Sequence, residues 1–140
     1  MIVTEVSFEI QPIGWVESPL VDLDQAPCQG DEGAPDCWIV FEEAVLEGLA
    51  DLEVGSEVLV LTGFDRARRD VLTVHPRSDV TRPRAGVFST RSPDRPNPVA
   101  LHRVSILRID GTRVQVGNLE AVHGTPVVDV KPVLGPVSER

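Results

Sequence analysis

Short runs of valine, isoleucine and leucine recur along the whole chain, and each one is closed by a proline, a glycine or another turn residue. Runs of this length and composition are typical of β-strands. The pattern therefore predicts a mostly β fold. We expect strands at residues 3–10, 13–17, 37–41, 57–63, 70–74, 86–90, 101–109, 113–118 and 127–131.

The clearest predicted strand pair joins residues 101–109 to residues 113–118. Asp110 and Gly111 separate the two runs, and an Asp-Gly dipeptide is typical of a tight hairpin turn. The apolar residues of the first strand share one face only if the strand contains a bulge. We therefore expect a hairpin here, with a bulge in its first strand.

One helix is expected at residues 42–52, where Val45, Leu46, Leu49 and Leu52 form an apolar stripe at helical spacing. Nine short strands and one short helix, joined by irregular loops, indicate a single-sheet β-barrel or a rolled sheet. A single domain over residues 1–140 is expected, because domains commonly contain about 100–150 residues.

Charge is distributed unevenly along the chain, whose net charge is −9. Residues 1–65 hold fifteen Asp and Glu and no Lys or Arg, whereas residues 66–140 hold all thirteen cations and seven acids. We interpret this as one barrel with an acidic rim and an Arg-rich rim, which would suit RNA, a ligand carboxylate or the acidic face of a second subunit. Arg82, Arg84 and Arg95 are the candidate RNA contacts.

Several classes of protein are not expected. No apolar run approaches the about 20 residues of a membrane span, and the N-terminus lacks the pattern of a signal peptide. Cys28 and Cys37 are interpreted as free thiols of a reducing compartment, which predicts a cytoplasmic location. Cysteine and histidine are too scattered for a structural zinc site, so no metal is expected.

The densest motif is the segment 86–98, in which an apolar run enters a loop with three prolines in six residues. Each proline fixes its own φ angle and restricts the residue before it, so the loop is predicted to be stiff. Two interpretations stay open at this point. The loop is either a preorganised polar binding surface or a rigid crossover whose polar groups satisfy its own backbone.

A second motif is the segment 124–132, in which Asp129 and Lys131 alternate with valines. The alternation places both charged side chains on one face of a strand. They form either an exposed ion pair or, if they face a pocket, a pair that orients a polar ligand. A third motif, at residues 12–19, is a short strand that ends at Ser18 and Pro19.

Together these motifs resemble the TsaA-like family, also known as TrmO or YaeB. The resemblance is carried, in order along the chain, by Ile13-Gly14 with Ser18-Pro19, Gly86 to Pro93 with Arg95-Pro96-Asn97-Pro98, and Gly124 to Pro132. It implies a single-sheet barrel that binds S-adenosyl-L-methionine and methylates N6 of the threonylcarbamoyladenosine at position 37 of tRNA. It also implies a homodimer, and a short form that lacks the further C-terminal region of the tRNA-modifying members.

The resemblance further implies a set of cofactor contacts. The residues that it assigns are Gln29, Gly30, Asp65, Arg66, Phe88, Arg91, Ser92, Leu101, His123, Gly124, Thr125 and Pro126. The chain departs from the usual family residues at Cys28, Asp65, Ala100, His102 and His123.

Methyl transfer from a sulfonium needs alignment more than it needs a protein nucleophile, because the methyl group is already activated. A general base would assist an amine acceptor, and the main candidates are Asp129 and His102, with Asp65 and His123 as further ones. Two other functions stay open: an enzyme that uses the same cofactor on a small molecule, and a cofactor-binding module without catalysis.

Overall fold

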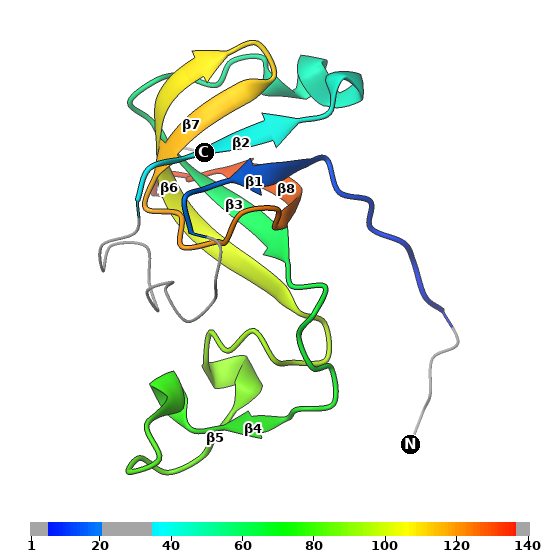
Figure 1. Cartoon of the computed structure of the whole chain (residues 1–140), viewed down its shortest axis with the longest axis vertical. Helices are drawn as coiled ribbons and strands as arrows, with labels where there is room; N and C mark the ends of the chain where they lie inside the picture. Colours follow the sequence, from blue (N-terminus) through cyan, green and yellow to red (C-terminus); the bar gives the residue numbers. More distant parts are fainter. Residues whose placement is uncertain (1–5, 21–34, 137–140) are drawn as a thin grey trace.

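The computed structural model describes residues 6–20 and 35–136, and most of their regular backbone is β-strand. Six antiparallel strands form a closed barrel in the order β1-β2-β7-β6-β3-β8 (Figure 1). Their bounds are β1 (Gly14–Glu17), β2 (Cys37–Phe41), β3 (Glu57–Gly63), β6 (Val99–Asp110), β7 (Arg113–Gly117) and β8 (Pro126–Pro132). The predicted single-sheet barrel is thereby confirmed.

The inside of the barrel is filled by every second residue of its strands, because successive strand side chains point to opposite faces. The buried core consists of Val16, Cys37, Ile39, Phe41, Val58, Val60, Val104, Ile106, Val114, Val116, Leu119, Ala121 and Val127. The backbones of β1 and β2 approach closely at Gly14, where an added Cβ would lie 2.4 Å from the carbonyl oxygen of Val40. This seam therefore requires glycine.

The hairpin between β6 and β7 has the predicted form. Asp110 pairs with Arg113, and Gly111 between them has a φ of +59°, which glycine adopts without strain. The register shifts between Ile106 and Arg108, which is the predicted bulge.

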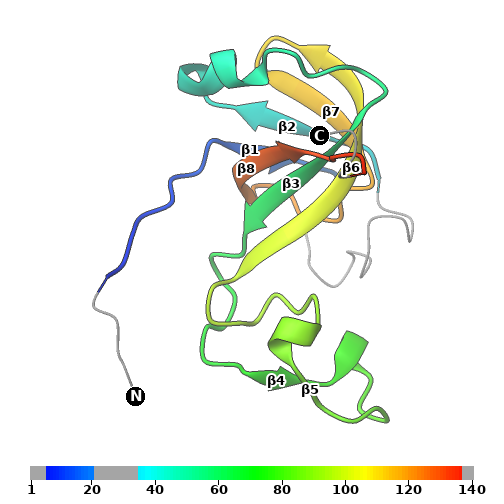
Figure 2. The ribbon, with the colours of Figure 1, turned by 180° about the vertical axis from the view of Figure 1, so that it is seen from behind.

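Residues 64–98, which we call the lobe, leave the barrel after β3 and return at β6. The lobe contains a two-stranded sheet of β4 (Thr73–Val74) and β5 (Ala85–Gly86) and two short 3₁₀ helices, η4 (Pro76–Ser78) and η5 (Val87–Ser89). It projects from one end of the barrel, whereas the 3₁₀ helix η3 (Glu43–Leu49) lies at the other end (Figures 1 and 2).

The position of the lobe corrects the interpretation of the charge pattern. Most of the arginines lie in a separate lobe, not on a rim of the barrel, and the acidic helix η3 lies at the opposite end of the molecule. The prediction of a single domain over residues 1–140 stays a prediction.

Three predicted elements differ in the structure. The run 86–90 is not a strand, because only Gly86 pairs, and the chain then turns into η5. The run 70–74 keeps only the two residues of β4. The predicted helix at 42–52 is the seven-residue 3₁₀ helix η3, which has no side-chain cap at its N-terminus. Three of its four predicted stripe residues still pack against the core.

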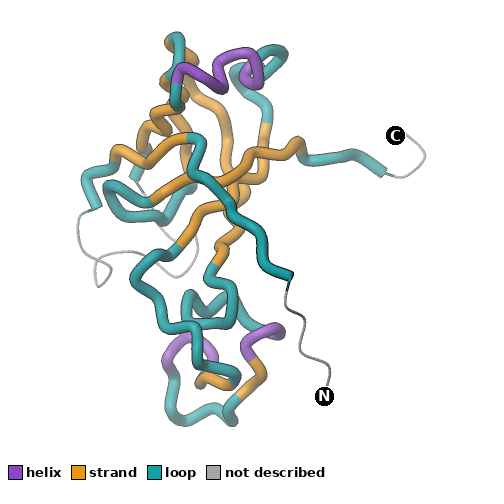
Figure 3. The backbone as a smooth tube through the Cα atoms, turned by 90° about the vertical axis from the view of Figure 1, so that its right-hand side faces the viewer, coloured by secondary structure: helices purple, strands orange, loops and turns teal. Residues whose placement is uncertain are grey.

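The first predicted strand, at residues 3–10, lies partly outside the described residues. Residues 6–12, which we call the arm, are extended and unpaired, and they run away from the barrel (Figures 1 and 3). Their alternating sequence predicts a strand, but no neighbouring strand of the described chain lies beside them. Among the described residues, no helix has the length and apolar character needed to cross a membrane.

Candidate functional site

The proline-rich loop of the lobe is shaped by Arg95. Its Nη2 donates hydrogen bonds to the carbonyl oxygens of Val87 (2.5 Å) and Thr90 (2.6 Å), and its Nε donates to the carbonyl oxygen of Ser92 (2.8 Å). One guanidinium therefore binds three backbone carbonyl groups of the loop. Two of them belong to Thr90 and Ser92, and the third, that of Val87, also accepts the N–H of Thr90 at the end of η5. The bonds of Arg95 agree with the second interpretation of the loop, a rigid crossover whose polar groups satisfy its own backbone. The predicted contact of Arg95 with RNA stays a prediction.

The other polar residues of the loop attach it to the preceding segment. The backbone N–H of Arg68 donates to Asp94 Oδ1 at 2.9 Å, and Arg69 donates to the carbonyl oxygen of Pro96 and to Asn97 Oδ1, both at 2.9 Å. These bonds hold two chain segments of the lobe together, and they leave few of the loop's polar groups free.

Arg91 is placed differently from Arg95. Its side chain is exposed, and its Nη1 donates one hydrogen bond, of 3.0 Å, to the carbonyl oxygen of Leu101 on β6. A guanidinium has five N–H donors, and this is the one bond recorded for it among the described residues. Arg91 thus connects the lobe to the barrel and keeps donors for a ligand. Two predicted cofactor residues, Arg91 and Leu101, are in direct contact.

An open cleft of about 1090 Å³ lies within the lobe. Its lining combines apolar, cationic and neutral polar side chains, among them Val80, Arg82, Arg84, Phe88, Arg91 and Ser92. The Phe88 side chain, 79% exposed, offers a free aromatic surface. Ligand pockets commonly measure about 300–1,000 Å³, so the cleft is large enough for a nucleotide-sized ligand.

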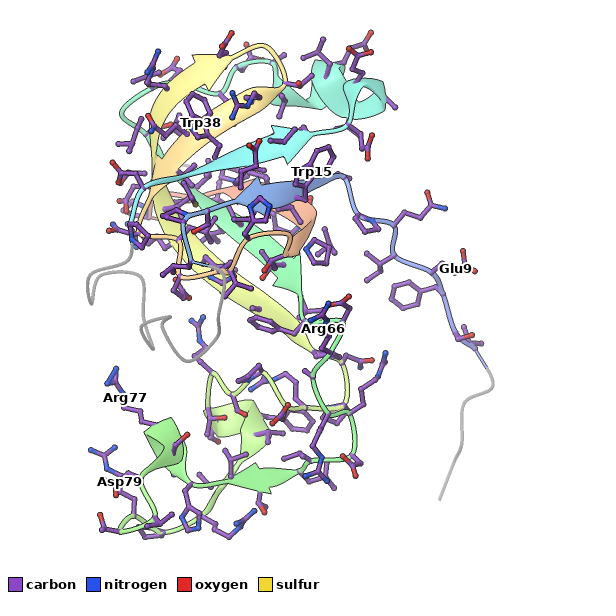
Figure 4. All side chains as sticks on the ribbon, in the orientation of Figure 1. Glu9, Trp15, Trp38, Arg66, Arg77 and Asp79 are labelled. Atoms are coloured by element: carbon purple, nitrogen blue, oxygen red, sulfur yellow. The ribbon has the colours of Figure 1, made fainter. Side chains whose placement is uncertain are left out.

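The barrel end that faces the lobe brings further predicted residues together. Gly63, the last residue of β3, pairs with Val99 of β6, and a Cβ added to it would lie 3.7 Å from the ring of Pro126. After Phe64 come Asp65 and Arg66, which are exposed, and Arg66 lies at the junction of barrel and lobe (Figure 4). Pro126, Gly63 and the start of β6 therefore form one continuous surface.

The turn before β8 closes the barrel between β8 and β1. Gly124 has a φ of +86°, and its N–H donates to the carbonyl oxygen of Val16 at 2.7 Å. The buried Thr125 hydroxyl donates to the carbonyl oxygen of Val122 at 2.7 Å, and His123 Nδ1 accepts the N–H of Ser18 at 3.3 Å. These predicted cofactor residues thus have structural partners of their own. Gln29 and Gly30 lie outside the described residues.

His102, a predicted general base, lies inside the barrel with both ring nitrogens in contact with partners, and its role as a base stays a prediction. Its side chain is 1% exposed inside the barrel, with Nε2 2.7 Å from Thr62 Oγ1 and Nδ1 2.8 Å from Glu120 Oε1. Nδ1 carries the proton in this contact, because a carboxylate only accepts. The sequence already contained the signal: residue 102 shares its strand face with Val104 and Ile106, both core residues. Thr62 shares its strand face with Val58 and Val60 in the same way, whereas Glu120 lies outside the strands and carried no such signal.

Asp129 forms the exposed ion pair that its spacing allowed. Its Oδ2 lies 3.0 Å from Lys131 Nζ, and its Oδ1 accepts the backbone N–H of Val130 at 2.9 Å. Both carboxylate oxygens are therefore engaged, and a role as general base stays a prediction. No group of three potential metal ligands occurs within residues 6–20 and 35–136.

The charges of the lobe are partly balanced within it. Arg68 pairs with Asp70 at 3.0 Å, and the hydrogen bond from Arg68 holds the pKa of Asp70 below its ordinary value. Arg82 lies 3.6 Å from Asp79, whose pKa is lowered mainly by hydrogen bonds from Thr81.

Arg84, in contrast, donates to neutral groups, the hydroxyl and the carbonyl oxygen of Thr73. Two acids of the first 65 residues pair with arginines of the barrel strands instead, Glu57 with Arg103 and Glu17 with Arg113.

Comparison with known proteins gives a consistent result. A family model described as the tRNA-methyltransferase O N-terminal domain matches residues 15–137. A probable S-adenosyl-L-methionine-binding protein of Methanothermobacter thermautotrophicus is 39% identical over 129 residues, which are 92% of either chain. An S-adenosyl-L-methionine-binding protein of Archaeoglobus fulgidus is 40% identical over 87% of this chain and 86% of its own length.

Longer proteins also match. A second, probable S-adenosyl-L-methionine-binding protein of Archaeoglobus fulgidus is 40% identical over 124 residues, but this chain covers only 33% of it. A crystal structure of TrmO from Pseudomonas aeruginosa superposes with a TM-score of 0.74 at 25% identity, over 94% of this chain and 56% of that one. The chain thus spans one third of the former and just over half of the latter.

Proposed function

The chain belongs to the family of the tRNA-methyltransferase O N-terminal domain, and from that premise we propose that it is an S-adenosyl-L-methionine-dependent methyltransferase. The finer part of the proposal is the acceptor, which is N6 of a threonylcarbamoyladenosine-type base in tRNA. The proposal also includes a cytoplasmic location.

The observation that carries the proposal is the contact between Arg91 and Leu101. The family resemblance assigns both residues to the cofactor, and a hydrogen bond of 3.0 Å joins them where the lobe meets the barrel. The chemistry of the surroundings fits the cofactor. Guanidinium donors suit its carboxylate, the exposed Phe88 and Leu101 suit its adenine, and the exposed Asp65 suits its ammonium.

The role of the protein is to bind and align. The cofactor supplies an activated methyl group when bound, and correct placement of two reactants is worth about 7–11 kcal/mol of the barrier. Arg91 would hold the carboxylate end, because its position is fixed by the bond to β6. Arg95 keeps the intervening loop in one shape, so Arg91 and Ser92 are presented in a fixed arrangement.

The acceptor part of the proposal rests on the lobe. Arg82 and Arg84 line its cleft with exposed side chains, and arginine is well suited to phosphate groups. A phosphate backbone would add binding that falls with rising salt concentration.

The cofactor part is tested by calorimetry on Arg91→Ala. We expect cofactor affinity to fall at least about tenfold, which corresponds to roughly 1.4 kcal/mol for a lost charge-assisted hydrogen bond. Arg108→Ala is the matched control, because Arg108 lies on β6 at the far side of the barrel bulge, over the ring of Trp38. Unchanged affinity in Arg91→Ala would refute the assignment.

The acceptor part is tested with radiolabelled methyl groups and tRNA from a strain that lacks this N6 methylation. We expect transfer into tRNA with the parent chain and loss of transfer with Arg91→Ala. Cofactor binding without transfer to tRNA would contradict the acceptor and leave the two other functions, an enzyme that acts on a small molecule and a binding module without catalysis.

A further inference from the structure

Three polar side chains in line connect β3, β6 and the segment that leads into β8. Thr62 on β3 contacts the His102 ring on β6 at 2.7 Å, and the other side of that ring contacts Glu120 at 2.8 Å. Thr62 and His102 are buried, and the Glu120 side chain is 19% exposed. We call these three side chains the polar bridge.

The hydrogen bonds of the polar bridge run in a defined direction. Nδ1 of His102 donates to the Glu120 carboxylate, so Nε2 of the neutral ring accepts the hydroxyl proton of Thr62. Among the described residues, no buried side-chain nitrogen or oxygen lacks a partner. A buried network with all its bonds made is rigid, because each hydrogen bond sets a direction as well as a distance.

Two members of the bridge lie beside residues that are proposed to bind the cofactor. His102 follows Leu101, whose carbonyl oxygen accepts the hydrogen bond from Arg91. Thr62 pairs with Val127, the first residue after the predicted cofactor residue Pro126. The bridge therefore lies at the end of the barrel that faces the lobe.

The third member, Glu120, lies in the connection between β7 and β8, residues 118–125. The recorded backbone hydrogen bonds of this connection involve residues 122–125. In its first half Leu119 and Ala121 pack in the core, but apolar contacts have no preferred direction. Among the described residues, the contact with His102 is the hydrogen bond recorded for residues 118–121.

We propose that His102 is a positioning residue for the cofactor site. Through Glu120 it fixes the connection, and with it the predicted cofactor residues 123–126, relative to Leu101 and Arg91 on the other side of the site. His102 acts without touching the cofactor, because its ring is enclosed by the barrel. The inference rests on the proposed function, and it names the residue that holds the two halves of that site in one arrangement.

The inference is tested at Glu120, since this side chain is partly exposed and its replacement perturbs the core less than that of His102. Glu120→Ala removes the acceptor of the Nδ1 proton, whereas Glu120→Gln keeps an acceptor oxygen in its place. In calorimetry we expect the affinity for S-adenosyl-L-methionine to fall about tenfold in Glu120→Ala and to stay within about twofold of the parent in Glu120→Gln.

A second measurement needs no cofactor. In the free protein we expect amide exchange at residues 118–126 to accelerate at least about tenfold in Glu120→Ala and to stay near the parent rate in Glu120→Gln. Val114→Ala is the control for a general loss of stability. Val114 is a buried core residue that pairs with Ile109 near the other end of β6, so its truncation lowers the thermal midpoint and leaves cofactor affinity unchanged.

Three results would overturn the positioning role. They are unchanged exchange at residues 118–126 in Glu120→Ala, binding by Glu120→Gln as weak as that by Glu120→Ala, and an equal loss of affinity in Val114→Ala. A parent chain that binds no S-adenosyl-L-methionine would instead refute the proposed function and, with it, the effect on affinity. The exchange rates would then still decide whether the bond between His102 and Glu120 fixes the connection.

Discussion

The barrel and the lobe are held together by different interactions. The barrel encloses a cluster of thirteen buried apolar residues, whereas Val87 is the one fully buried apolar residue of the lobe. The lobe instead relies on directed bonds, above all those from Arg95 to three carbonyl groups and from Arg69 to Pro96 and Asn97.

We infer from this difference that the barrel supplies most of the stability of the molecule, whereas the lobe supplies the proposed binding residues. Burial is non-directional and scales with area, so the barrel should unfold as one cooperative unit. A segment held mainly by exposed hydrogen bonds opens at lower free energy than the core. The residues proposed for binding lie in the lobe or at its junction, where a local change of shape does not disturb the barrel.

The largest expected effect comes from the same substitution made in both regions. Gly14→Ala places a Cβ 2.4 Å from a backbone oxygen in the barrel, whereas Gly86→Ala in the lobe meets no atom within 4 Å. We expect Gly14→Ala to lower the free energy of unfolding by about 3 kcal/mol and Gly86→Ala to leave it almost unchanged. Urea unfolding followed by circular dichroism measures both. If both substitutions lowered the free energy of unfolding equally, the barrel would not be the more tightly packed region.

The second effect concerns the buried histidine. His102→Leu leaves the Thr62 hydroxyl and the Glu120 carboxylate without their partner, so we expect a loss of about 2–3 kcal/mol. Arg103→Leu changes the adjacent residue of the same strand, whose exposed pair with Glu57 should contribute little. Thermal unfolding of both variants checks the prediction. A more stable His102→Leu would show that the buried polar group serves something other than stability.

The third effect is a fall in the free energy of unfolding at alkaline pH, and it arises from a residue of the barrel, Cys37. Burial, reinforced by Asp36 and Glu120, raises the pKa of the Cys37 thiol from 9.0 to about 12. The folded state therefore prefers the protonated thiol. Its contribution to stability is complete below about pH 9 and is lost as the pH rises toward 12, at up to about 1.4 kcal/mol per pH unit.

The composition helps to isolate this titration, because the chain has no tyrosine, a single lysine and one further cysteine, Cys28, which the variant Cys37→Val leaves in place. Urea midpoints at pH 8, 9 and 10 should decline above pH 9 in the parent chain and decline less in Cys37→Val. An equal decline in both would assign the effect to another group.

The smallest effect on global stability, and the most local one, is expected at Arg95. Arg95→Lys keeps the charge but not the planar fork, so the three carbonyl bonds cannot all form. We expect amide exchange at residues 87–95 to accelerate at least about tenfold while the thermal midpoint changes little. Mass spectrometry of exchanged peptides measures this, with barrel peptides as the internal control. Amide exchange that stays slow throughout the lobe of Arg95→Lys would contradict the view that hydrogen bonds from Arg95 hold this part of the lobe together.

How much the sequence predicts also differs between the two regions. The barrel strands match their predicted ranges to within one or two residues, because alternation and turn residues are local signals and the barrel obeys both. The run at residues 86–90 looks equally apolar, yet it forms η5. Its shape depends on Arg95, which binds the carbonyl groups of Val87 and Thr90 from later in the chain. No local pattern contains that information.

The candidate site shows the same limit. Motif order was sufficient to pair Arg91 with Leu101 as cofactor residues, and the structure places them in contact. Residue type alone suggested His102 as a base, but strand alternation places it inside the barrel. Which face a residue occupies has to be settled before its chemistry is assigned.

The lobe begins and ends at one point of the barrel. Gly63 and Val99 are direct partners in neighbouring strands, and the N–H of Phe64 donates to the carbonyl oxygen of Pro98 at 2.9 Å. In topological terms the lobe is the connection of an antiparallel β3–β6 hairpin, and each doubling of such a connection costs only about 0.6 kcal/mol. Residues 64–98 can therefore be replaced by a connection of another length without moving the paired ends of β3 and β6. Relatives can differ there in length and in the ligand that they bind while the barrel stays the same.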